Sequence, residues 1–262
     1  MPPVAATRPK PPPVRFVAPS GLAVYPGTDN GHGLIRAHQR ANRGRQEFEG
    51  TSDMADIFTL SAPELAALLC SRVCHDIISP VGAINNGLEL LDEGGADEDA
   101  MKLIRASARN ASARLQFARI AFGAAGSAGM QIDTGDAEAV ATAYVRNEKP
   151  ELEWSGPRAL LPKNKVKLLL NLLLVAIGAV PRGGKITVTL ADVETSPVFT
   201  LVSAGPMVRV PPKFLELHSG SKPSEPIDAH AVQPYYTLLL AREAGMEISI
   251  RASAEDIVFV AR

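Results

Sequence analysis

Apolar residues recur three and four positions apart over residues 65–91, and this spacing predicts one long amphipathic helix. Ser61 precedes Glu64 by three positions at the start of the pattern. Such a pair forms a capping box, so we expect the helix to begin there. Glycines at positions 94 and 95 end the pattern, as is typical of a helix C-terminus.

A second helical pattern covers about residues 97–121 and follows the first after a short connection. Two helices joined in this way form an antiparallel hairpin. They cannot enclose both of their apolar stripes alone, so we expect a homodimer in which two hairpins complete a four-helix bundle. We assign this helical hairpin, as the dimerisation module, to residues 54–126.

The pattern changes after a joint of small residues at 123–129, and helical and alternating segments then follow one another. Alternation of apolar and polar residues predicts strands, and longer apolar periodicity predicts helices. Helices are expected at 136–147, 162–180 and 232–244, and strands at 151–155, 185–191, 198–202, 247–251 and 257–260. The fold class is therefore α+β, with the hairpin followed over residues 130–262 by an α/β sandwich.

Residues 1–53 differ from the rest of the chain because they are rich in proline, glycine and arginine and show almost no apolar periodicity. Such a segment cannot bury enough surface to offset the entropy lost on ordering, so we expect disorder. Met54 stands directly before the first helical signal. We interpret it as the start of translation, so that residues 1–53 are either not translated or a dispensable tail.

Composition narrows the function classes. Hydrophobic residues make up 46% of the chain and the net charge is −1, so a sizeable core is possible and no electrostatic footprint for nucleic acid is present. The longest apolar run, at 166–180, includes Lys167 and Asn171 and is too short and polar to span a bilayer. With no leader sequence, we expect a cytoplasmic protein without membrane contact, and Cys70 and Cys74 as packed, reduced thiols.

The candidate chemistry lies inside the first helix, where His75 is followed directly by Asp76 and one turn later by Ser79 and Pro80. Helical spacing puts His75 on a polar face that should point to solvent. The residues that share this face are Arg72, Ser79, Gly82 and Asn86. The apolar residues expected on the opposite side are Leu69, Val73, Ile84 and Leu88.

An exposed imidazole can carry a phosphoryl group, because one ring nitrogen keeps a free lone pair near neutral pH. Asp76 can orient the ring or take up its proton. Arg72 can neutralise phosphoryl oxygens, and Ser79 can hydrogen-bond them. We therefore take His75 and Asp76 as candidate catalytic residues, and Arg72, Ser79 and Asn86 as candidate binding residues.

The sequence around His75 resembles the H-box of two-component histidine kinases. Residues 69–91, which include the run CHDIISPVGAINNGLEL, are similar to the ChpT histidine phosphotransferases of alphaproteobacteria. The resemblance covers residues 54–262. It implies a dimeric hairpin that carries a phosphohistidine, followed by a domain resembling a degenerate histidine-kinase ATP-binding domain.

The resemblance also implies partners. The phosphoryl group would come from the receiver domain of a CckA-like hybrid histidine kinase and pass to CtrA-like and CpdR-like response regulators that control the cell cycle. No cofactor is expected in this chain, because the partner receiver domain would supply Mg²⁺.

Three departures from the kinase pattern argue against ATP binding. Kinases carry a second asparagine in a motif that begins here with Asn171, but that position is Val175, and a hydrocarbon cannot coordinate a hard cation. The best match to the adenine-recognising Asp-x-Gly is the run Ser-Ala-Gly at 203–205. Residues 227–231 stand where kinases have a glycine-rich lid.

Two alternatives remain open on sequence grounds: an active histidine kinase with an aberrant ATP site, and a non-catalytic module that binds regulators. A zinc site at Cys70, Cys74 and His75 is less favoured, since no second ligand pair has suitable spacing. His218 and His230 flank a segment rich in serine, proline and glycine, and we interpret both as loop residues.

Overall fold

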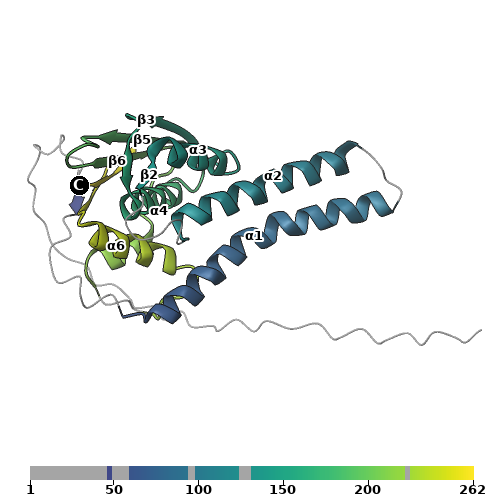
Figure 1. Ribbon diagram of the computed structural model, residues 1–262, viewed down its shortest axis with the longest axis horizontal. Helices are drawn as coiled ribbons and strands as arrows, with labels where there is room; N and C mark the ends of the chain where they lie inside the picture. Colours follow the sequence, from purple (N-terminus) through teal and green to yellow (C-terminus); the bar gives the residue numbers. More distant parts are fainter. Residues whose placement is uncertain (1–45, 49–58, 94–97, 124–130, 222–224) are drawn as a thin grey trace, which may run out of the picture. The chain divides into compact units, whose positions relative to one another are not determined.

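The computed structural model describes residues 46–48, 59–93, 98–123, 131–221 and 225–262 (Figure 1). These ranges belong to one compact unit of the chain. Met54 and all of the N-terminal extension except 46–48 lie outside the described residues. The prediction of disorder and the prediction about the translation start therefore stay predictions.

The first two helices form the expected hairpin. Helix α1 covers Ala62–Asp92 and α2 covers Glu98–Ala121, and the two pack against each other. The capping box is present: the Ser61 side chain accepts from the Glu64 N–H, and the Glu64 carboxylate accepts from the Ser61 N–H at 2.9 Å. The Ser61 hydroxyl also donates to the Glu64 carboxylate, at 2.6 Å, and this hydrogen bond, together with that from the Ser61 N–H, lowers the pKa of Glu64 below its usual value.

A mixed sheet of six strands forms one layer of the second module, in the order β1-β7-β8-β6-β5-β3. All neighbouring pairs are antiparallel except β3 and β5, which are parallel. The strands of this sheet are β1 (Gln46–Phe48), β3 (Glu151–Ser155), β5 (Lys185–Ala191), β6 (Val198–Ala204), β7 (Ile248–Ala252) and β8 (Asp256–Ala261). Two further strands, β2 (Gln131–Asp133) and β4 (Leu160–Pro162), pair separately.

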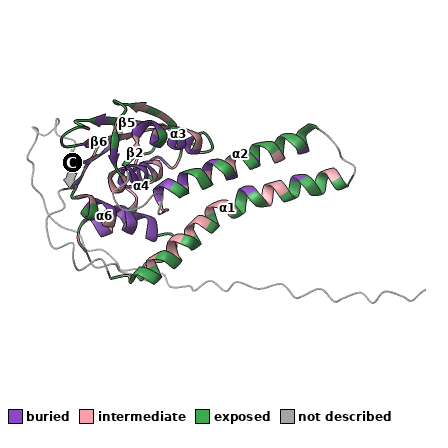
Figure 2. Cartoon of the chain, in the orientation of Figure 1, coloured by how far each residue is buried: buried purple, intermediate pink, exposed green. Residues whose placement is uncertain are grey.

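Helices cover the sheet and complete the core. They are α3 (Thr134–Val145), α4 (Lys163–Ala179), α5 (Pro212–His218) and α6 (Val232–Ala244). Helix α4 packs on β6, β8 and α6, and most of its residues are buried. Figure 2 shows the contrast with the hairpin, where most of the ribbon is exposed or intermediate.

The predicted helices and long strands are confirmed to within a few residues, and the α+β class is confirmed. Strands β1, β2 and β4 were not predicted, because three residues are too few for an alternating pattern to be recognised. Helix α5 was also missed. It is seven residues long and begins at a proline pair, which reads as a loop when no fold is known.

Polar contacts join the hairpin to the sheet module. Arg114 of α2 donates to the Glu148 carboxylate at 2.7 Å and to the Tyr144 hydroxyl at 3.4 Å. At the start of α1, the Leu60 N–H donates to the Tyr235 hydroxyl on α6 at 3.2 Å. Because both α2 and the beginning of α1 are tied to the second module, the middle of α1 is brought near the segment that precedes α6.

Candidate functional site

His75 lies in the middle of α1 with its side chain 69% exposed, as the helical spacing predicts. Its Nδ1 is 3.5 Å from Asp76 Oδ1, a long contact for a hydrogen bond. The other oxygen of Asp76 accepts from Arg72 Nε at 3.0 Å. The three side chains therefore form a chain from guanidinium to carboxylate to imidazole, and Nε2 of His75 is left on the far side of the ring from Asp76.

The position of Arg72 differs from the sequence-based expectation. Its Nε pairs with Asp76 on the same helix, and both side chains are only partly exposed, at 25% and 21%. In this arrangement the guanidinium stabilises and orients the carboxylate. The i,i+4 spacing of the two residues was a usable signal for this pair.

Ser79 and Asn86 are both exposed on α1, but they differ in distance from His75. Ser79 follows one turn later, within reach of a group that docks on the ring. Asn86 is eleven residues from His75, or about 16 Å along the axis at the α-helical rise. It can contact a docked protein but not a group bonded to the ring. At Gly82, an added side-chain carbon would meet no atom within 4 Å, so this side of the helix is open.

A second exposed stripe runs along α1 beside the histidine face, and it corrects two expectations. Leu88, expected on the buried side, is 47% exposed, and both cysteines are free and exposed rather than packed. The stripe repeats at intervals of three and four residues, the spacing of a helix-bundle seam. We call it the α1 seam; its members are Cys70, Cys74, Ile78, Val81, Asn85 and Leu88.

His230 is the site residue that sequence reasoning missed. It lies exposed in the turn before α6, and its ring centroid is 5.6 Å from that of His75, with the ring planes at 77°. This is an edge-to-face contact. No local signal in the sequence indicates it, because the two residues meet only once α6 packs beside α1.

His218 was interpreted as a loop residue, and that interpretation is wrong. It is the last residue of α5 and is buried. Its Nε2 is 2.7 Å from the Ile248 carbonyl oxygen at the start of β7, to which it donates. A buried ring whose nitrogen is engaged with the backbone serves the fold and is not available for chemistry at the surface.

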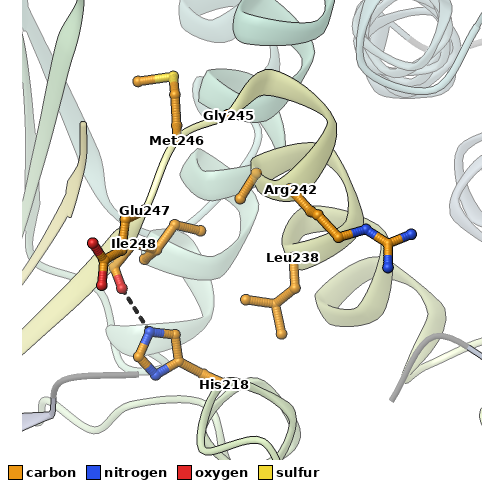
Figure 3. Close-up of a pocket in the computed structure, with 8 residues that line it drawn as sticks. His218, Leu238, Arg242, Gly245, Met246, Glu247 and Ile248 are labelled. Carbon is orange, nitrogen blue, oxygen red and sulfur yellow. Dashed lines mark hydrogen bonds between the residues drawn. The ribbon is translucent and has the colours of Figure 1, made fainter. Parts of the chain in front are cut away.

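A cavity of about 340 Å³ opens beside this histidine (Figure 3). Its walls are formed by the C-terminal half of α6, the end of α5 and the start of β7. At its rim Gly245 adopts a left-handed conformation, with φ of 63°, and ends α6. None of the lining residues belongs to the three segments compared above with kinase nucleotide motifs, at 171–176, 203–205 and 227–231.

Those three segments are instead built into the core or the surface turn. Asn171 is fully buried, and its amide nitrogen donates to the carbonyls of Ala121 and Lys167, both at 2.9 Å. Its Oδ1 has no partner among the described residues. Val175 is buried one turn later, and the Ser203 hydroxyl donates to the Ala176 carbonyl at 3.0 Å.

Within the described ranges, no group of three or more His, Cys, Asp or Glu side chains is arranged to hold a metal ion. One described helix, α1, is long and apolar enough to cross a membrane when judged by length and composition alone. The sequence-based argument had considered only the run at 166–180, which forms the buried helix α4.

Known proteins of similar sequence place the chain in a family. The family model for the histidine phosphotransferase C-terminal domain matches residues 134–256. The protein phosphotransferase ChpT of Brucella abortus (strain 2308) is 76% identical over 203 residues, which cover 78% of this chain and 97% of that protein. This chain belongs to the ChpT family of histidine phosphotransferases.

A solved structure supports the same membership. It is a bacterial phosphotransferase that is 73% identical and superposes with a TM-score of 0.75, covering 79% of this chain and 99% of that one. The family assignment made from the residues around His75 is therefore confirmed. The roles of the individual site residues stay predictions.

Proposed function

We propose that this chain is a homodimeric, ATP-independent histidine phosphotransferase in which His75 carries the phosphoryl group. It would accept the group from a receiver-domain aspartate of a CckA-like hybrid histidine kinase. It would then pass the group to aspartates of CtrA-like and CpdR-like response regulators that control the cell cycle, in the cytoplasm. The observation that carries the proposal is an exposed imidazole, on a helix of a ChpT-family chain, with a carboxylate beside Nδ1.

In the transfer step, the P–O bond of the aspartyl phosphate breaks and its electron pair returns to the receiver carboxylate. A P–N bond forms at the same time with the lone pair of His75 Nε2. The ring gains positive charge, and its Nδ1 proton is shared with Asp76. Arg72 holds the far oxygen of that carboxylate. Reversal of the step on a second receiver completes the relay.

Catalysis of phosphoryl transfer is mainly positioning and charge stabilisation. Because the donor and the acceptor are both receiver domains in this proposal, Mg²⁺ would come from their acidic pockets, and this chain needs no cofactor of its own. Its contribution is an accessible nucleophile on a rigid helix. The open side of α1 around Gly82 leaves room for the receiver to approach.

ATP independence is supported by the burial of the kinase-like motif. Asn171 is fully buried, and its amide nitrogen donates to two backbone carbonyls in the core. The position of the second asparagine is the buried Val175. Isothermal titration of the purified protein with Mg²⁺–ATP is expected to show no binding. Binding in the micromolar range would favour the alternative of an active kinase with an aberrant site.

The homodimer is supported by the α1 seam. Ile78 is 70% exposed and Leu88 47% exposed in the single chain, and apolar side chains at bundle spacing are stabilised when a partner helix covers them. A bilayer is the other candidate cover for α1. The Arg72–Asp76 pair and His75 near the middle of the helix favour a protein partner, because charged groups are costly in a bilayer.

The experiment mixes the purified protein with a receiver domain labelled at its aspartate by its own kinase and [γ-³²P]ATP, then removes ATP. Label is expected to move to this chain, to be stable in alkali and labile in acid as phosphohistidine is, and to be absent from His75→Ala. If His75→Ala accepts label at the wild-type rate, the assignment of the nucleophile is wrong. If the receiver binds but no label moves to the wild-type chain, the protein is a binding module.

A further inference from the structure

His230 stands out because its environment is not explained by packing. Every residue from Ala231 to Leu238 is buried, so the start of α6 faces the core. His230 and Asp228 in the turn before it are exposed, and the His230 ring meets the ring of His75. A histidine placed at the surface against the candidate nucleophile, by a segment far away in the sequence, calls for a chemical explanation.

The turn that presents His230 is held in place by its own hydrogen bonds. Asp228 Oδ1 accepts from the backbone N–H groups of His230 at 2.9 Å and of Ala231 at 2.7 Å. The Asp228 carbonyl accepts from the Val232 N–H at 2.9 Å. The hydrogen bonds to the carboxylate, that of Ala231 foremost, lower the pKa of Asp228. These hydrogen bonds fix the backbone on both sides of His230, so the point from which its side chain projects toward His75 is set before a ligand arrives.

The charges around His75 show what is missing from the site. A phosphoryl group on the ring would bring a charge approaching two negative units. The nearest cation on α1, Arg72, is paired with Asp76, and Asp76 itself repels a phosphoryl group. His230 presents N–H groups from the second module. Since imidazole donates from one nitrogen when neutral and from both when protonated, it can serve a phosphoryl oxygen in either form.

We propose that His230 binds the phosphoryl group on His75, donating an N–H hydrogen bond to a non-bridging oxygen. This proposal rests on the proposed function and extends it. It makes the phosphoryl site composite, with the nucleophile on α1 and an oxygen-binding group on the turn before α6. No bond to His230 forms or breaks. The residue stabilises charge and holds the phosphorylated ring in one orientation.

The composite site gives the second module a chemical task in a chain that does not use ATP. The module would bring one imidazole to the hairpin through α6, whose Tyr235 hydroxyl also accepts from the backbone at the start of α1. The distance between the two histidines therefore depends on how α6 sits against α1. Loss of that packing would separate the phosphoryl-binding group from the nucleophile without altering the helix that carries His75.

The test uses the full chain and two independent phosphoryl sources: phosphoramidate, a small donor that needs no partner, and the labelled receiver domain described above. Five variants are compared with wild type: four single variants and the double variant of His75→Ala with His230→Ala. His230→Ala removes the side chain, and His230→Phe keeps an aromatic ring against His75 but has no N–H. His230→Asn restores a donor without an imidazole, and His75→Ala reports on the nucleophile.

A hydrogen bond to a charged group is worth enough to change a rate by about tenfold or more. We therefore expect both His230→Ala and His230→Phe to accept phosphoryl from the receiver about tenfold more slowly than wild type. His230→Asn should recover much of the loss. The ³¹P resonance of the phosphohistidine should shift in the Ala and Phe variants, a readout that a purely structural role would not move.

The outcomes separate the two proposals. If His230→Phe matches wild type in rate and in ³¹P shift, the contact is only ring packing and the inference is overturned. If His230→Ala matches wild type while His75→Ala stays unlabelled, the inference fails and the proposed function stands. If phosphoramidate labels His75→Ala but not the double variant with His230→Ala, His230 is itself an acceptor, and both assignments are wrong.

Discussion

The hairpin and the sheet module differ in the burial and hydrogen bonding of their polar side chains. In the sheet module, Asn171, Ser203 and His218 are buried and bound to backbone carbonyls of neighbouring elements. On the hairpin, His75 is exposed, and its contacts are a long one to Asp76 and an edge-to-face one to the His230 ring. The exposed imidazole of His75 is therefore accessible to a reaction partner, whereas the buried polar side chains of the sheet module are engaged in hydrogen bonds that stabilise the fold.

The same contrast applies to apolar side chains. The buried face of α4 is enclosed on all sides within the chain, whereas seven large hydrophobic residues of the hairpin remain exposed. These are Ile78, Val81, Leu88, Leu90, Met101, Leu103 and Leu115. The core of the sheet module is formed within the single chain, and the exposed apolar residues of the hairpin would be covered by the second chain of the proposed homodimer. A site on an incomplete surface is well placed for exchange with other proteins.

The largest predicted effect contrasts Asp76, beside the proposed phosphoryl carrier His75, with the buried His218. Asp76→Asn keeps the shape of the residue next to His75 but removes its charge, so phosphoryl transfer should slow by about 10² to 10⁴, the range of general acid–base contributions. His218→Ala should leave transfer near the wild-type rate but lower the unfolding free energy by about 2 kcal/mol, because a buried hydrogen bond is lost. Receiver-labelling kinetics and urea unfolding measure the two effects. A stable protein with unchanged transfer in Asp76→Asn would contradict the assigned role.

A second prediction reverses the loss of the kinase asparagine. Val175→Asn restores the residue that the kinase motif carries, at a position that is 2% exposed. We expect it to destabilise the protein by about 2 to 4 kcal/mol, because a buried amide would have no partner there. We also expect no gain of ATP binding by calorimetry. Val175→Ala serves as the control for lost volume. ATP binding by Val175→Asn would mean that the pocket is intact and only one ligand is missing.

A third prediction tests the α1 seam with a matched pair of leucines. Leu88 is 47% exposed and belongs to the seam, and Leu90 is 49% exposed but lies off it. Leu88→Glu should weaken the homodimer by about tenfold or more, because a charge would be buried in the interface. Leu90→Glu should leave it unchanged. Sedimentation equilibrium distinguishes the two, and equal behaviour of both variants would remove the seam from the interface.

The smallest predicted effect concerns the join between the hairpin and the sheet module. Burial, with Glu148 nearby, raises the pKa of Tyr144 from 10.0 to about 12. Between these two values the unfolded chain loses the phenol proton and the folded chain keeps it, so stability should fall as the pH rises from 10 to 12. Tyr144 should account for about 2 kcal/mol of this fall. Tyr144→Phe should remove that share, and urea unfolding at several pH values measures it.

Tyr236 should produce a similar fall, since burial also raises its pKa to about 12. However, the Tyr236 hydroxyl accepts a hydrogen bond from Lys167 Nζ at 3.0 Å, and burial lowers the pKa of that lysine. Tyr144 is therefore the cleaner test. If the slope between pH 10 and pH 12 is the same in Tyr144→Phe as in wild type, the phenol is not held protonated by the join.

Much of the fold followed from the sequence where the signal was local. The capping box at Ser61 and Glu64 placed the start of α1, and the long apolar periods of α1 and α4 were unambiguous. Strands β2 and β4 were not predicted, because each is three residues long. Leu88 was expected on the apolar side of α1 and is 47% exposed in the single chain, because a helical period shows which residues share a face but not what covers that face.

The candidate site was only partly predictable for a related reason. His75, Asp76 and Ser79 lie within two turns of one helix, so their mutual placement depends on helical geometry alone. The Arg72–Asp76 pair has the same origin and was missed only because another role was assigned to the arginine. His230 could not have been found, since nothing near it in the sequence points to α1.

The sequence alone determined which chemical groups share one turn of α1, because a helix repeats every 3.6 residues whatever surrounds it. It also determined the family, through the run around His75. Only the tertiary structure decided that His230 meets His75, that His218 is buried, and that Asn171 is committed to the core. These contacts join residues far apart in the chain, and they depend on how the whole core packs.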